Sequence, residues 1–288
     1  REAELVAPLQ LGRRLAVVSD ATTHAVLGAR VERALAPLGT ILPVVLEKAP
    51  HADAHMAERV RRACAAADAL ERGAAAKGMK VEILVGDHQN KPDVGANIAR
   101  QWYDVDKVDM IVDVPTSSVV LAVNEVTKQK GKALLVSTGA TSDLTGKACN
   151  ANAIHWTYDT WMLANGTGSA IVKTGGDTWF FLTADYAFGH ALERDTEAVV
   201  LKNGGKVAGK VRAPLNTQDF SSFLLQAQAS KAKIIGLANA GGDTRNSIKQ
   251  AAEFGIVKGG QNMAGLLVFL LDVHALGLPA AQGLIFTE

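Results

Sequence analysis

The sequence predicts an α/β protein of two doubly wound lobes, each with a parallel sheet covered by helices, joined by a hinge. Short β-rich runs alternate with longer helical patterns almost from end to end. Most of the strand candidates are continuous apolar runs, which is typical of strands buried on both faces. A weak internal repeat indicates that the same arrangement occurs twice.

The expected strands and helices follow from these patterns and from clear stops such as Asn203-Gly204-Gly205, where glycine supplies the positive φ that ends a helix. The strands are expected at Leu15–Ser19, Ile41–Leu46, Lys80–Gly86, Met110–Val114, Ala133–Ser137, Thr178–Thr183, Lys206–Arg212, Lys233–Ala238, Gly265–Leu271 and Leu284–Phe286. The helices are expected at Val94–Tyr103, Val119–Lys130, Ala187–Asn203, Phe220–Ala229 and Arg245–Phe254.

The stretch Ile154–Gly168 interrupts the alternation and is interpreted as the crossover between the lobes. The predicted N-terminal lobe is therefore residues 1–157 and the C-terminal lobe residues 158–288. Two similar lobes imply a cleft. In open α/β sheets a ligand binds beyond the carboxyl ends of the strands, where helix N-termini converge.

Composition excludes several classes of protein. The 288 residues are 48% hydrophobic, and 30 Lys+Arg against 29 Asp+Glu give a net charge of +1. The basic residues also form no evident stripe in the sequence, so there is no electrostatic case for nucleic-acid binding. Two cysteines support neither a disulfide framework nor a zinc quartet. The longest apolar run, Ala264–Leu271, has the length of a buried strand, and no signal peptide is recognised.

Two hydroxyl-rich turns in the first lobe are the strongest candidates for a binding site. Each follows a buried strand and leads toward a helix, so hydroxyls and unpaired backbone N–H groups are expected to face outward, which suits a carboxylate. The alternative is that Ser117 and Thr141 only cap helices. The candidate residues in these turns are Ser117, Ser118, Gly139, Ala140 and Thr141.

Two turns of the second lobe stand in the same topological position. Tyr186 and Phe188 are expected to stack on a flat or branched ligand. Asn239 and Asp243 follow another strand, and Asp243 is a candidate acceptor for a cationic or hydroxyl group, or alternatively the N-cap of the helix near Arg245.

Catalytic and cofactor motifs fail when they are checked residue by residue. Gly166-Thr167-Gly168 lacks the third glycine of a dinucleotide loop, and Gly146-Lys147 lacks the hydroxyl residue of a phosphate-binding loop. His51, Asp53 and His55 have no evident further zinc ligand except Glu58, and a solvated helix is the preferred interpretation. We therefore predict no catalytic residue, no cofactor and no metal.

Five motifs follow one another along most of the chain: Asp87–Asp93, Pro115–Ser118, Ser137–Thr141, Asp185–Gly189 and Gln218–Ser221. Through these motifs the chain, from about residue 80 to residue 288, resembles the type I periplasmic solute-binding proteins of ABC importers, specifically the leucine/isoleucine/valine-binding family. The resemblance implies a hinged receptor in which Ser117, Ser118, Ala140 and Thr141 hold a carboxylate and Tyr186 and Phe188 cover the ligand.

The N-terminal part of the chain contains the run Gly12–Asp20 followed by Thr22-Thr23-His24. Through these residues the segment 11–70 instead resembles the N-terminal segment of glycerol-1-phosphate dehydrogenases, which are relatives of iron alcohol dehydrogenases. It suggests a chimera, with residues 1–72 foreign, residues 73–157 binding-protein-like, and the final elements of the binding-protein fold missing after Glu288.

These resemblances imply a substrate-binding component of an ABC transporter, not an enzyme. Its ligand is expected to be a branched-chain amino acid or an aromatic acid, its partner a membrane permease, its compartment the periplasm, and a homo-oligomer is possible. Two alternatives stay open at this point: an NAD(P)-dependent glycerol-1-phosphate dehydrogenase-like enzyme, and a chimeric scaffold with no retained function.

Overall fold

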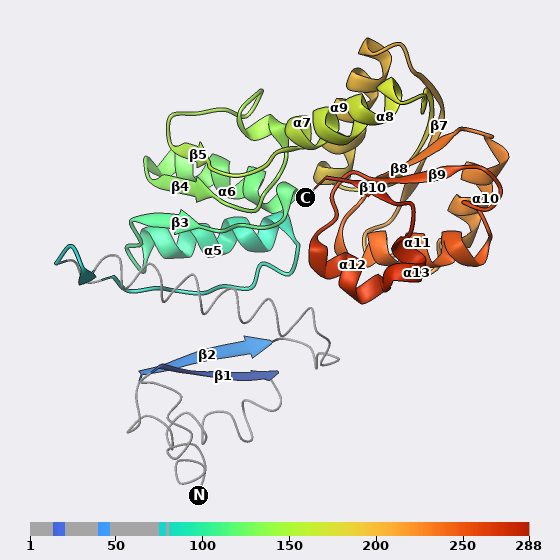
Figure 1. The fold of residues 1–288 in the computed structure, drawn as a ribbon. Coiled ribbons are helices and arrows are strands. Elements are labelled where there is room, and N and C mark those ends of the chain that lie inside the picture. The colour runs from blue at the N-terminus through green and yellow to red at the C-terminus, as the bar shows by residue number, and fades with distance from the viewer. Residues whose placement is uncertain (1–13, 21–39, 47–74, 79–80, 288) are drawn as a thin grey trace, which may run out of the picture. The chain divides into compact units, whose positions relative to one another are not determined.

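The computed structural model describes residues 14–20, 40–46, 75–78 and 81–287 (Figure 1). The chain divides into two compact units, Arg1–Asp87 and His88–Glu288. In the first unit β1 (Arg14–Asp20) and β2 (Thr40–Leu46) pair in parallel, from Arg14 opposite Thr40 to Asp20 opposite Leu46. The first two strands predicted from the sequence are therefore confirmed.

The predicted strand Lys80–Gly86 is wrong over residues 81–86, which have no regular secondary structure. Its apolar side chains are exposed, with Val81 at 38%, Leu84 at 40% and Val85 at 56%. An apolar run forms a strand only where a neighbouring strand accepts its backbone hydrogen bonds, and no such partner is present among the described residues.

The second unit contains a three-stranded parallel sheet in the order β3-β4-β5. Its strands are β3 (Met110–Val112), β4 (Ala133–Val136) and β5 (Ala153–His155), and its helices are α5 (Pro92–Asp104) and α6 (Ser117–Lys130). Helix α6 presents Val119 and Val123 to Leu134 in a buried cluster, and it ends at Gly131, whose φ of 60° is the left-handed conformation that glycine adopts most easily.

The same unit contains a five-stranded parallel sheet in the order β10-β9-β8-β6-β7. Its strands are β6 (Thr178–Ala184), β7 (Lys206–Ala213), β8 (Ile234–Ala238), β9 (Asn262–Gly265) and β10 (Ile285–Phe286). The α/β class with parallel sheets is confirmed.

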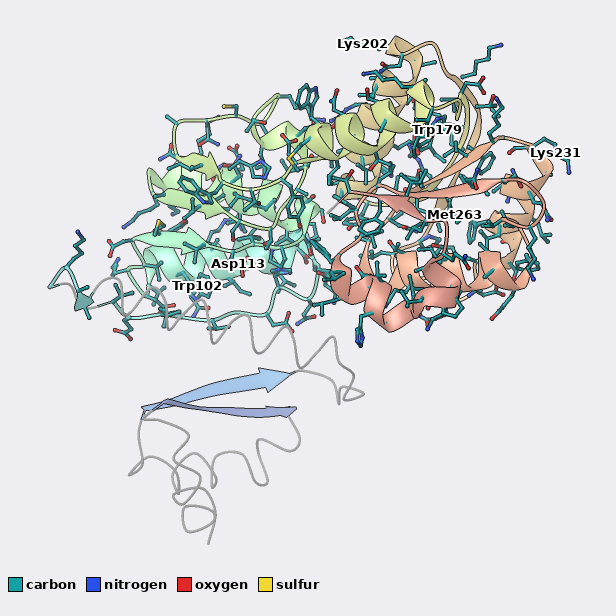
Figure 2. The ribbon with its side chains drawn as sticks, viewed as in Figure 1. Trp102, Asp113, Trp179, Lys202, Lys231 and Met263 are labelled. Atoms are coloured by element: carbon teal, nitrogen blue, oxygen red, sulfur yellow. The ribbon has the colours of Figure 1, made fainter. Side chains whose placement is uncertain are left out.

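Helices cover both faces of this larger sheet, as a doubly wound fold requires (Figure 1). One face carries α7 (Thr160–Leu163), a π-helical turn η5 (Ala164–Gly168), α8 (Ser169–Lys173) and α9 (Ala187–Lys202). The other carries α10 (Ser221–Ala229), α11 (Gly241–Glu253), α12 (Leu270–Leu276) and α13 (Leu278–Ala281). Figure 2 labels one core residue of each face, Trp179 and Met263.

Two sequence predictions in this unit need correction. The stretch Ile154–Gly168 is not a plain crossover, because Ile154 and His155 belong to β5 and pair with β4. Of the strand predicted at Gly265–Leu271, only Gly265 belongs to a strand, as the last residue of β9. Leu270 is already the first residue of α12. Leu266 and Val268 are nevertheless fully buried, so their apolar character reflects burial in a loop and not a sheet ladder.

The remaining predicted strands and helices are confirmed with small shifts at their ends. The predicted lobe boundary between residues 157 and 158 stays a prediction. Within the described part of the chain, no helix has the length and apolar character needed to cross a membrane.

Candidate functional site

The N-terminus of α6 lacks a side-chain cap. Thr116 occupies the N-cap position, but its hydroxyl donates to Asn90 Oδ1 at 2.6 Å. It therefore accepts no hydrogen bond from the first helical N–H groups. Ser117 follows with 1% of its surface exposed, and its Oγ has no hydrogen-bond partner. Ser118 is half-buried. Ser117 is therefore not a helix cap, contrary to the capping alternative.

The turn after β4 packs tightly against the same helix. Gly139 is buried, and a Cβ at this position would lie 2.6 Å from Val120 Cγ1 of α6 and 2.9 Å from the carbonyl oxygen of Val114. Only glycine permits that approach. Gly139 thus brings this turn close to α6, and the next two residues, Ala140 and Thr141, are 3% and 0% exposed.

Thr141 behaves as the capping alternative predicts. Its hydroxyl accepts a hydrogen bond from the Asp143 N–H at 3.3 Å, at the start of a short 3-10 helix, η4 (Ser142–Leu144). Two further hydroxyls of this turn, those of Ser137 and Thr138, donate to Asp113 at 3.0 and 2.8 Å. Asp113, labelled in Figure 2, directly follows β3.

A polar network ties this turn to α9. Asp195 of α9 accepts hydrogen bonds from the hydroxyls of Ser142 and Thr160, both at 2.6 Å, and pairs with Arg194 at 2.9 Å. Arg194 also contacts Asp143 at 3.1 Å. The network continues into the candidate turn, because the Thr160 N–H donates to the carbonyl of Ala140 at 2.8 Å.

The turn after β6 places two aromatic side chains together. Tyr186 is the N-cap residue of α9, and its ring centroid lies 5.9 Å from that of Phe188. A Cβ on Gly189 would lie 2.0 Å from the carbonyl oxygen of Ala184, so glycine is required where α9 meets the strand end. Burial raises the pKa of Tyr186, and the charge of Asp243 raises it further, which keeps the hydroxyl protonated as a donor.

In the turn after β8, the polar side chains of Asn239 and Asp243 form hydrogen bonds within the protein. Asn239 is 1% exposed, accepts from the Thr244 hydroxyl at 2.7 Å and donates to Ser247 Oγ at 3.4 Å. Asp243 is 5% exposed and accepts from the Asn216 N–H at 3.1 Å. It lies in the first turn of α11, whose N-cap is Ala240, so Asp243 is not the N-cap. Burial raises the pKa of Asp243, and the backbone N–H groups of Asn216 and Thr217 partly oppose that rise.

One buried cluster joins candidate residues from two of the four turns. Ala140 and Phe188 belong to it, and Tyr186 packs against it, as does Ala240 of the turn after β8, which is not a candidate residue. Two residues that the sequence analysis does not select also pack there, Tyr158 and Phe269, whose rings meet edge to face with centroids 6.1 Å apart. In the sequence Tyr158 lies in the predicted crossover and Phe269 in a predicted strand. Neither position indicates a binding residue.

Two hollows in the described part of the chain lie away from these turns. One of about 20 Å³ is lined by residues that include Ile248, Met263 and Leu284, and one of about 430 Å³ lies beside Val273 and Leu278. Among the residues whose side chains are described, no group of three or more His, Cys, Asp or Glu side chains is placed to hold a metal ion. The His51, Asp53 and His55 group and residue Cys64 lie outside the described residues.

A model of a protein family, described as periplasmic binding protein, matches residues 54–288. The chain belongs to the periplasmic binding protein family. No curated protein matches the chain.

Solved structures agree with this family. A periplasmic binding protein from Burkholderia mallei is 41% identical, with a TM-score of 0.69, over 96% of this chain and 66% of its own. A branched chain amino acid ABC transporter periplasmic ligand-binding protein from Burkholderia xenovorans is 29% identical, with a TM-score of 0.58, over 95% of this chain and 66% of its own. A solute-binding protein from R. palustris in complex with benzoate, 16% identical with a TM-score of 0.64 over 95% of this chain and 67% of its own, shares the fold. This chain thus spans about two thirds of the length of these proteins.

The comparisons do not support the resemblance of residues 11–70 to glycerol-1-phosphate dehydrogenases. The family match begins at residue 54, inside that segment, and the Burkholderia mallei structure covers 96% of the chain. The error has a physical reason. Strands joined by helical segments occur in many parallel α/β folds, so a short apolar run followed by a helical pattern does not identify one family. The family and these solved structures are binding proteins and not enzymes.

Proposed function

We propose that this chain is the ligand-binding part of a periplasmic solute-binding protein, which captures a small carboxylate and delivers it to an ABC permease in the membrane. Family membership supports the general role. The observation that supports a carboxylate ligand is the buried, unpartnered hydroxyl of Ser117 at the uncapped N-terminus of α6. In this proposal the ligand is held between lobes 1–157 and 158–288 by hinge closure.

The α6 terminus favours an anion for two reasons. The first N–H groups of a helix point outward and carry the positive end of the helix dipole, and here no side chain neutralises them. A hydroxyl buried without a partner costs about 1–3 kcal/mol, so Ser117 is tolerated best if an acceptor is present in the working protein. A ligand carboxylate supplies that acceptor, and the neighbouring turn at Ala140 and Thr141 completes the same side of the site.

The aromatic side chains support an aromatic acid as the ligand. Tyr158, Tyr186, Phe188 and Phe269 share one cluster with Ala140, and aromatic rings pack favourably on a flat ring at offset or edge-on geometry. Two neighbours of the same fold, from R. palustris, are in complex with benzoate and 4-hydroxybenzoate. A branched-chain amino acid is the second candidate, supported by the Burkholderia xenovorans protein.

The proposal is tested by thermal unfolding and calorimetric titration of the whole chain. Benzoate, 4-hydroxybenzoate and leucine are compared with neutral analogues, benzamide and leucinol. At a ligand concentration about 100 times the dissociation constant, a bound carboxylate stabilises the protein by about 2.7 kcal/mol and raises its melting temperature. The neutral analogues should give no shift. If no carboxylate raises the melting temperature, or if benzamide does so equally, the proposal is wrong.

A further inference from the structure

The hydroxyl of Thr116 is bonded to a residue outside the helix that it precedes. Thr116 is the N-cap residue of α6, and its φ of −96° and ψ of 123° are the extended backbone that a capping residue adopts. Its Oγ1 nevertheless donates to Oδ1 of Asn90 at 2.6 Å and caps no N–H of the first turn. A residue type that normally caps a helix is therefore present at the right position, and Asn90 holds its hydroxyl away from the helix.

Asn90 stands in a segment with an unusual backbone. Gln89 and Asn90 have φ of 53° and 57°, the left-handed conformation, which costs energy for residues other than glycine and which asparagine tolerates better than most. The Asn90 N–H donates to Nδ1 of His88 at 3.1 Å, and the Lys91 N–H donates to the His88 carbonyl at 2.8 Å. These bonds fix the backbone that carries the Asn90 side chain.

The same segment lies where the starts of α5 and α6 meet. A Cβ on Gly95, near the start of α5, would lie 2.4 Å from Cγ1 of Val119 in α6 and 3.5 Å from Cβ of His88. The two helices therefore touch at a glycine, with His88 beside the contact. Packing thus holds the segment near the start of α6, and its position does not depend on the Thr116 hydroxyl alone.

The N–H groups that Thr116 does not cap lie beside an unpartnered side chain. Ser117, the first residue of α6, is 1% exposed, and its Oγ has no hydrogen-bond partner. A capping hydroxyl accepts from the N–H of the second or third helical residue, and an anion at a helix N-terminus binds the same groups. A Thr116 cap and a ligand carboxylate would therefore compete for one set of donors.

We propose that Asn90 is a positioning residue of the carboxylate site, because it holds the Thr116 hydroxyl away from α6 and so keeps the helix N-terminus open for the ligand. The inference rests on the proposed function, and it adds a residue that does not itself touch the ligand. Without the Asn90 acceptor, the hydroxyl is free to rotate and cap α6. The ligand must then displace that cap, so affinity falls although no group that contacts the ligand has changed.

Asn90→Gly tests this role, because glycine adopts the left-handed backbone easily and carries no acceptor. The probes are benzoate, 4-hydroxybenzoate and leucine, titrated calorimetrically into the whole chain. For each probe that wild type binds, we expect the dissociation constant to rise about fivefold, the factor that corresponds to one helix cap. Gln89→Gly is the matched control at the neighbouring left-handed position. It leaves the Asn90 acceptor in place and should change the affinity by less than about twofold.

Thr116→Val removes the competing hydroxyl and gives the decisive comparison. Valine keeps the β-branched shape at this buried position and leaves α6 uncapped, so the affinity should stay within about twofold of wild type. Added to Asn90→Gly, the same substitution should restore the lost affinity. It should also lower the midpoint of urea unfolding without ligand, because it removes the cap that Asn90→Gly allows. A purely structural role of Asn90 would not produce tighter binding together with lower stability.

The outcomes separate this inference from the function on which it rests. If wild type binds none of the three probes, the proposed function is wrong, and Asn90 has no carboxylate site to position. If wild type binds but Asn90→Gly binds as tightly, or Gln89→Gly binds as weakly as Asn90→Gly, the function stands and the role of Asn90 is wrong. That role is also wrong if Asn90→Gly and the double variant bind equally weakly, because the loss would then not depend on the Thr116 hydroxyl.

Discussion

The turns after β3 and β4 have the same position in the fold, yet they use their hydroxyls in opposite ways. In the first turn the Thr116 hydroxyl is drawn away to Asn90, and Ser117 Oγ is buried with no partner. In the second turn Thr141 caps a 3-10 helix and Ser142 donates to Asp195. Two hydroxyl-rich turns that look alike in sequence therefore differ in whether a hydroxyl remains available to hydrogen-bond to a ligand.

The comparison teaches that a polar side chain is informative about binding when its hydrogen bonds are incomplete. A hydroxyl whose bonds are satisfied inside the protein contributes to stability and to the shape of the turn. A hydroxyl left buried and unpaired costs stability, and for Ser117 at the uncapped terminus of α6 we propose that a ligand carboxylate supplies the missing partner. The second turn should therefore govern folding, and the first should govern binding.

The largest expected effect is on the network of the second turn. Asp195→Ala removes the acceptor for the hydroxyls of Ser142 and Thr160, and Thr160 is fully buried. The free energy of unfolding should fall by about 3 kcal/mol, because two donors lose a charged partner. Asp195→Asn keeps one oxygen acceptor and should lose less. Urea unfolding of the three proteins measures this, and a loss below about 0.5 kcal/mol for Asp195→Ala would show that the network is not structural.

The next effect concerns the contact between the second turn and α6. Gly139→Ala places a methyl group within 2.6 Å of Val120 and 2.9 Å of the Val114 carbonyl, so the turn must move. We expect a loss of about 2 kcal/mol and weaker carboxylate binding. Gly242→Ala is the control, because a Cβ there meets only Arg245 Nη2 at 4.0 Å. Equal stability of the two variants in urea would refute the close packing.

A smaller effect separates the two hydroxyls directly. Thr141→Val removes the acceptor for the Asp143 N–H and should lower the free energy of unfolding by about 1 kcal/mol. Ser117→Ala removes a hydroxyl that has no partner and should leave stability unchanged or slightly higher. Both are measured by urea unfolding without ligand. If Ser117→Ala is destabilised more than Thr141→Val, the proposed difference between the two turns is wrong.

The smallest effect is a pH dependence that belongs to His155. Burial lowers the pKa of this imidazole below the ordinary 6.5, so the unfolded chain binds a proton more readily than the folded chain. The free energy of unfolding should therefore decrease as the pH falls below about 6.5, and level off below the folded pKa, by less than about 1 kcal/mol. In His155→Gln this decrease should be absent. Urea unfolding between about pH 7.5 and 5.5 tests it, and identical slopes in both proteins would contradict it.

Much of the fold could be predicted from the sequence because its signals are local. Helix α9 follows from apolar periodicity and the stop at Asn203-Gly204-Gly205, and the buried strand β8 from a continuous apolar run. Strand β5 escapes prediction because three residues, Ala153 to His155, carry no periodicity. The run at Gly265–Leu271 is not a strand throughout, and burial alone does not separate a strand from a buried loop.

The candidate site could be predicted only in part. The turns are visible in sequence because strand ends and glycines mark them, whereas the partner of each hydroxyl depends on distant residues. Ser142 and Asp195 are 53 positions apart, and Tyr158 meets Phe269 from a different element. No local pattern indicates which of Ser117 and Thr141 is left unpaired. That distinction appears only when the packing of α6, β4 and α9 is known.

Calorimetric titration of wild type and Ser117→Ala with the tightest-binding carboxylate, alongside Thr141→Val, tests the central claim most directly. We expect binding to one site in wild type, a dissociation constant about tenfold or more higher in Ser117→Ala, and a much smaller change in Thr141→Val. Unchanged affinity in Ser117→Ala, or an equal loss in both variants, would contradict the assignment of the α6 terminus as the carboxylate site.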